Sequence, residues 1–127
     1  MIGIEKSSNV QGSLSAVLSK MSSQPAARAL AAVLASIKSE LSNAKVQISN
    51  DRRRATVTLQ NGRFATVRVT PPSTLPGETH RFRFKTPVDI HKYDRLYFGG
   101  VTNEGRTVVR QFKPSEIGTM KTITVKF

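Results

Sequence analysis

Basic side chains recur at alternate positions in two stretches of the sequence, a spacing that suits the binding of phosphate groups. Arg52 and Arg54 begin the first stretch, and Arg81, Arg83 and Lys85 make up the second. Residues two apart on a β-strand share a face, because successive side chains point to opposite sides. Guanidinium groups bind phosphate through paired hydrogen bonds. The spacing therefore predicts a cationic β-sheet face that binds a polyanion.

The sequence pattern indicates a β-hairpin most clearly, and the register of this hairpin determines which residue lies opposite each arginine. Two segments rich in β-branched residues flank Asn61-Gly62. A two-residue loop would put the apolar residues of the two arms on opposite faces, which a buried face rejects. We therefore predict a three-residue loop over 60–62, with Gly62 in the left-handed conformation of a bulged turn. Arg54 then lies directly opposite Arg68, and such a like-charge pair is destabilising unless an anion compensates it.

The predicted binding face combines the two basic stretches with one aromatic side chain. If the strand over 80–85 belongs to the same sheet as the hairpin, their cations form one platform. Phe64 is the candidate for stacking on an unpaired base, and Arg63 at the turn adds a flanking contact. The candidate nucleic-acid-binding residues are Arg52, Arg54, Arg63, Phe64, Arg68, Arg81, Arg83 and Lys85.

The net charge favours a binding face over a merely solvated one. Twenty Lys and Arg residues against eight Asp and Glu residues give a formal charge of +12, and the isoelectric point is about 11.0. A basic domain of this kind is typical of nucleic-acid partners. Alternating arginines in an ordinary protein usually mark a solvated face, and a single Phe usually packs. Here the total charge and the predicted Arg54–Arg68 pair shift the interpretation toward a polyanion, with DNA-binding and RNA-binding equally open.

Signals for catalysis are few, and we expect no enzyme activity and no cofactor. The chain has no cysteine, which excludes disulfides, thiol nucleophiles and cysteine-based zinc sites. His80 and His91 are eleven positions apart and lack metal-ligand spacing. No phosphate-binding loop or nucleophile elbow is present, and no small-molecule site is evident. A nuclease-like enzyme is retained only as a third hypothesis, because the eight carboxylates are scattered.

No apolar run approaches the roughly 20 residues that span a bilayer. The first residues also lack the basic and apolar regions of a secretory signal. We therefore expect a cytoplasmic or virion location and no membrane span.

The elements that must position these residues form an α+β domain, with two N-terminal helices followed by a five- to six-stranded, mostly antiparallel sheet. Apolar residues at helical spacing predict a helix from Ser13 to Met21 and a second from Pro25 to Asn43. From Lys45 the apolar period changes to two. Val46 and Ile48 alternate with polar residues. Strands are predicted over 54–59, 63–70, 80–85, 94–101, 106–112 and 122–127, with a bulge at Gly99-Gly100 and one helical turn at 113–116. We expect residues 1–127 to form a single domain, with 1–12 a flexible arm, 13–44 the helical segment and 45–127 the β-sheet segment.

The function predicted first is that of a small, basic nucleic-acid-binding protein that is non-catalytic and weakly sequence-specific. The alternative is a structural or assembly subunit of a virus or phage particle, with its basic face toward the genome. In that case the helical segment or the edge of the C-terminal strand would contact a second copy or another assembly partner.

Overall fold

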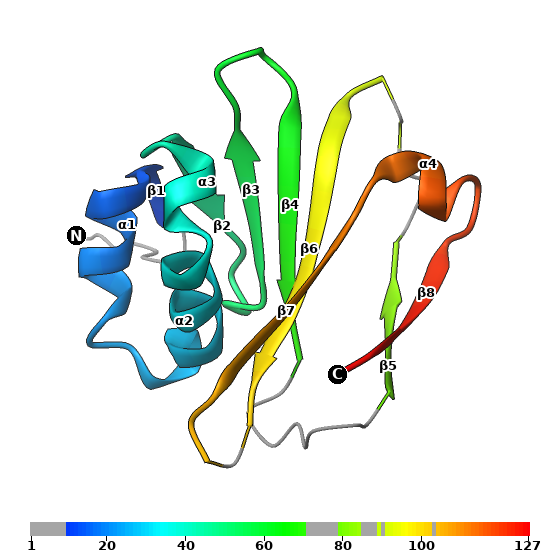
Figure 1. Ribbon diagram of the computed structural model, residues 1–127. Helices are drawn as coiled ribbons and strands as arrows, with labels where there is room; N and C mark the ends of the chain where they lie inside the picture. The colour runs from blue at the N-terminus through cyan, green and yellow to red at the C-terminus, as the bar shows by residue number, and fades with distance from the viewer. Residues whose placement is uncertain (1–9, 71–78, 85–88, 90, 103) are drawn as a thin grey trace, which may run out of the picture.

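The fold has three layers: a group of helices, a main β-sheet and a small second sheet. The computed structural model describes residues 10–70, 79–84, 89, 91–102 and 104–127. The helices between residues 14 and 41 lie on one side of the main sheet. Strands β5 (Thr79–Arg83) and β8 (Thr122–Lys126) lie on the other, together with the short helix at 114–117 (Figure 1). The class is α+β and the main sheet is mostly antiparallel, as the sequence predicts. No helix in the described part of the chain is long and apolar enough to cross a membrane.

The helical layer begins as predicted, but its second helix is broken. Ser13 caps α1, its hydroxyl oxygen accepting a hydrogen bond from the Ala16 N–H at 3.4 Å. The segment predicted as one helix from Pro25 to Asn43 divides at Ile37, where φ is −108° and ψ is 11°. Ile37 stays buried through the break, so the apolar periodicity continues and gives no sign of it. The elements are α1 (Leu14–Met21), the 3-10 turn η1 (Pro25–Ala27), α2 (Arg28–Ser36) and α3 (Lys38–Leu41).

The main sheet has the strand order β1-β2-β3-β4-β6-β7. Its strands are β1 (Val10–Ser13), β2 (Lys45–Ile48), β3 (Arg54–Thr58), β4 (Phe64–Val69), β6 (Tyr93–Val101) and β7 (Thr107–Phe112). Neighbouring strands are antiparallel except for β4 and β6, which are parallel. The strand at Val10–Ser13 corrects the predicted arm over 1–12, whose first nine residues lie outside the described part. A four-residue strand with a single buried apolar side chain leaves little pattern to find.

The hairpin of β3 and β4 has the predicted register. Arg54 is paired with Arg68, and Val57 with Ala65. Gly62 has a φ of 83°, and its N–H donates to the Leu59 carbonyl across the turn. The apolar side chains on the inward face of the two strands pack under the helices: Ala55, Val57, Ala65, Val67 and Val69 are buried and Leu59 is partly buried.

The strand that carries Arg81 and Arg83 does not belong to the main sheet, which corrects the predicted platform. This strand, β5 (Thr79–Arg83), pairs antiparallel with β8 (Thr122–Lys126) in a separate two-stranded sheet. The short helix α4 (Pro114–Ile117) lies between β7 and β8 in the chain. Phe82 packs on Phe98 of β6, with ring centroids 4.7 Å apart. The second core that results contains Phe82, Phe84, Leu96, Phe98, Ile117, Ile123, Val125 and Phe127.

Gly99 serves close packing and not the predicted bulge. The pairing of β6 with β7 runs without interruption from Leu96 to Val101. A Cβ atom on Gly99 would lie 2.7 Å from Cγ2 of Val33 and 3.0 Å from the Val108 carbonyl oxygen. The missing side chain therefore lets α2 approach the sheet closely.

We expect Gly99→Ala to destabilise the protein by about 1–3 kcal/mol, because the added methyl overpacks the contact with Val33. Urea unfolding measures this change. Val33→Ala also lowers the free energy of unfolding, because it leaves a cavity. The Gly99→Ala, Val33→Ala double variant should lose less unfolding free energy than the two single variants added together. Strict additivity would contradict the steric explanation.

Candidate nucleic-acid interface

The side of the main sheet that faces away from the helices is polar in one half and apolar in the other. One row of paired residues reads, from β1 to β7, Gln11, Gln47, Thr56, Thr66, Leu96 and Phe112. A second row reads Arg54, Arg68, Phe98 and Arg110. The small sheet covers the half with Leu96 and Phe98, because burial of apolar surface drives the contact. The polar half on β1–β4 is not covered by the small sheet or by any other described element, and it is named here the open face.

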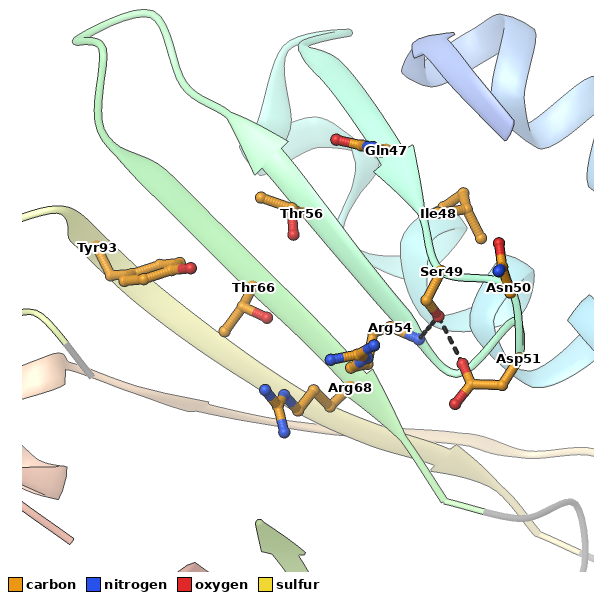
Figure 2. Close-up of a pocket in the computed structure, with 10 residues that line it drawn as sticks. All are labelled: Gln47, Ile48, Ser49, Asn50, Asp51, Arg54, Thr56, Thr66, Arg68 and Tyr93. Atoms are coloured by element: carbon orange, nitrogen blue, oxygen red, sulfur yellow. Dashed lines mark hydrogen bonds between the residues drawn. The ribbon is translucent and has the colours of Figure 1, made fainter. Parts of the chain in front are cut away.

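The open face is hollowed into a groove. A recess of about 570 Å³ is lined by Gln47, Ile48, Ser49, Asn50, Asp51, Arg54, Thr56, Thr66, Arg68 and Tyr93. A second recess of about 620 Å³ is lined by Gln11, Gly12, Ser13, Lys45, Val46, Gln47, Thr56, Thr58 and Phe64. The two share Gln47 and Thr56 and therefore lie side by side, and together they are named the groove here. Arg54 and Arg68 extend from neighbouring strands into the first recess, and the Tyr93 ring lies at its other end (Figure 2).

The turn before β3 fixes the position of Arg54. The Ser49 hydroxyl donates to Oδ1 of Asp51 at 2.6 Å, and its oxygen accepts from the Arg54 N–H at 3.1 Å. The same carboxylate oxygen accepts from the Arg53 N–H. The hydrogen bond from Ser49, with smaller contributions from Arg53 and Arg54, lowers the pKa of Asp51. Arg54 therefore begins its strand from a turn held by these hydrogen bonds, with its side chain exposed on the open face.

Arg68 lies half-buried where the groove meets the small sheet. Its Nη1 donates to the Arg83 carbonyl oxygen, and its guanidinium carbon is 4.1 Å from the ring centroid of Phe84. Burial, and then the positive charge of Arg54, lower the pKa of Arg68 to about 10. The side chain is still charged at neutral pH. Nε of Arg68 has no hydrogen-bond partner among the described residues.

An aromatic pair borders both recesses. Phe64 and Tyr93 are partners across β4 and β6, and their ring centroids are 6.1 Å apart with the planes tilted by 52°. Nζ of Lys92 is 5.4 Å from the Phe64 centroid. The sequence interpretation found Phe64 but missed Tyr93, because the predicted strand began at Asp94. Extending the alternation back would have put Tyr93 on the helix-facing side with Tyr97, because the register shifts between Tyr93 and Arg95 and no sequence signal marks that shift.

Two of the predicted site residues lie elsewhere in the structure. Arg52 has a left-handed backbone, with φ of 60°, and its Nε donates to Oε1 of Gln24 in the helical layer at 2.9 Å. Arg63 reaches β6, where Nη1 lies 3.2 Å from Oδ1 of Asp94 and Nη2 donates to the Tyr93 carbonyl. The positive φ at Arg52 interrupts the alternation that placed it beside Arg54.

The second basic stretch is also separate from the open face. Phe82 and Phe84 point toward the main sheet and are buried, so Arg81 and Arg83 lie on the outer side of β5, where both are exposed. Only the backbone of Arg83 approaches the groove, through its bond from Arg68. Lys85 lies outside the described residues. Of the predicted residues, the groove therefore brings together Arg54, Phe64 and Arg68.

Acidic and histidine side chains do not gather in the described part of the chain. No group of three or more that could hold a metal ion occurs there. His80 packs against Phe127, with ring centroids 5.9 Å apart, and the His91 N–H donates to Oδ1 of Asp89.

No protein-family model, curated protein or solved structure matches this chain. The chemistry of the groove itself is then the basis for assigning a function.

Arg68→Ala should loosen the small sheet, because it removes the hydrogen bond to Arg83 and the cation–π contact with Phe84. These contacts together are worth about 1–2 kcal/mol. Amide hydrogen exchange in β5 should therefore accelerate by roughly 5- to 30-fold. Arg54→Ala is the matched control, since no side-chain contact joins Arg54 to β5 among the described residues, and it should leave that exchange unchanged. Equal effects of the two variants would contradict the bridging role of Arg68.

Proposed function

We propose that this protein is a small, basic nucleic-acid-binding protein that holds its ligand in the groove of the open face. The observation that carries the proposal is the pairing of Arg54 with Arg68 at the border of the open face, where Arg54 is exposed and Arg68 is half-buried. Like charges directly opposite one another destabilise a sheet. A bound phosphate would relieve this repulsion and satisfy donors on both guanidinium groups.

The rest of the groove supports the same ligand. Thr56 is exposed between the arginines and the aromatic pair, and Thr58 is exposed directly opposite Phe64. Hydroxyl groups of this kind donate to phosphate oxygens. Lys45 and Lys92 are exposed at the same end as Phe64. These hydroxyl and ammonium groups would contact the sugar–phosphate backbone and not the base edges. The proposed binding therefore depends only weakly on nucleotide sequence. The proposal includes no catalytic step and fits a cytoplasmic or virion location.

The net charge of +12 supports the proposal at longer range. A strongly positive surface attracts a polyanion and raises the rate of encounter. Displacement of condensed counterions from the nucleic acid then makes affinity fall steeply with salt.

Arg54→Gln should weaken the binding of labelled DNA and RNA oligonucleotides by a similar factor for every sequence. It should also reduce the slope of log affinity against log salt by about 1, because one phosphate contact is lost. Fluorescence anisotropy at several salt concentrations measures both quantities. Arg28→Gln removes the same charge from an exposed position on the opposite, helical side of the sheet and is the matched control.

Absence of binding to any oligonucleotide at low salt would overturn the proposed function. Equal losses in Arg54→Gln and Arg28→Gln would show that net charge matters and the groove does not.

A second candidate, an assembly subunit of a virus or phage particle, is favoured by the strand edges. β1 and β7 end the main sheet, and β8 pairs only with β5 among the described residues. An edge strand presents unpaired N–H and C=O groups to another chain. In this proposal the groove would face the packaged genome and the edges would contact neighbouring copies.

If the chain is an assembly subunit, light scattering should show a mass that rises above that of one chain as concentration increases, or when nucleic acid is added. Association through strand edges buries backbone donors that are otherwise exposed. A single-chain mass at every concentration, with and without nucleic acid, would contradict this candidate.

A further inference from the structure

We infer that the groove takes a single strand of nucleic acid and not a duplex, with a phosphate between Arg54 and Arg68 and an unpaired base against the Phe64–Tyr93 pair. This inference rests on the proposed function and narrows it to one class of ligand.

The depth of the arginine site favours a flexible strand. Arg54 is exposed, but Arg68 is half-buried at the foot of the small sheet, where it bonds to Arg83 and stacks on Phe84. The recess that contains both arginines has a volume of about 570 Å³, which is the size of a site for a small molecule. A duplex carries its phosphates on the outside of a stiff rod that is far wider than this recess. It could touch Arg54, but a single strand can bend inward to reach Arg68 as well.

The aromatic pair favours unpaired bases. Tyr93 lines the first recess and Phe64 the second, and both rings are partly exposed. Phe64 and Arg68 share the open face four residues apart on β4, or roughly 13 Å at about 3.3 Å per residue. Bases in a duplex already stack on each other, so an aromatic surface inside a groove serves bases that are unpaired.

Aromatic side chains elsewhere on the same side of the sheet are covered, so the exposure of Phe64 and Tyr93 is confined to the groove. Phe98 is fully buried beneath the small sheet, and Phe112 packs against it with ring centroids 5.6 Å apart. Phe64 and Tyr93 belong to the same surface but lie where the small sheet does not cover it. Lys92 above the Phe64 ring adds a cation at the point where the next phosphate would pass.

The test compares a labelled single strand of about 12 thymidines with a duplex of the same length, a size within the range that one such site covers. Anisotropy should show the single strand binding at least about 10-fold more tightly than the duplex, as expected for added base stacking. Arg54→Gln should weaken the single strand.

Leucine variants separate stacking from charge. Tyr93→Leu and Phe64→Leu keep an apolar side chain but lose the ring, and each should weaken the single strand by roughly 5- to 100-fold. Both should leave the duplex unaffected. Phe112→Leu removes a ring from the covered half of the same surface and is the matched control. Thermal unfolding of each variant shows whether the fold is retained.

Each outcome separates the inference from the proposed function. Duplex binding as tight as single-strand binding and still dependent on Arg54 would overturn the inference and leave the proposed function standing. A single-strand preference that neither folded leucine variant reduces would also overturn it. No binding of either probe at low salt would overturn both.

Discussion

Packing of aromatic side chains around Phe98 holds the small sheet against the main sheet, and the groove depends on where this packing stops. Phe82, Phe84 and Phe112 all lie within aromatic contact distance of Phe98. On the neighbouring strands the same surface is mostly threonine, glutamine and arginine, with Phe64 and Tyr93 as the exceptions, and it gives a second layer little apolar area to bury. The small sheet therefore stops at β6, and its border becomes one wall of a groove.

Arg68 stands at this border and connects stability to binding. Its contacts with Arg83 and Phe84 tie the wall to the floor of the groove, while its charge faces Arg54. Such local conflicts between charge placement and stability are common at functional sites.

Local features of this fold could be predicted from the sequence, and long-range ones could not. The hairpin register followed from Gly62 and from the need to keep apolar side chains on one face, and so the Arg54–Arg68 pair was predicted correctly. The alternation of Phe82 and Phe84 with arginines was also correct. The strand that pairs with β5 was not predicted correctly. Alternation indicates which face of a strand is buried, but it does not indicate which strand lies beside it. Arg52 was misplaced for a local reason, since a positive φ inverts the side-chain direction without a glycine to signal it.

The pairing of β5 with β8 has a consequence for the order in which the fold forms. Paired residues in these strands are 39 to 47 positions apart, whereas β3 and β4 are joined by a tight turn. Closing a long loop costs more entropy and slows the formation of the contact. On a ribosome, the helices and the first four strands of the main sheet are synthesised well before β8 emerges. The floor of the groove can therefore fold first, and β5 must wait for the last strand before the wall is complete.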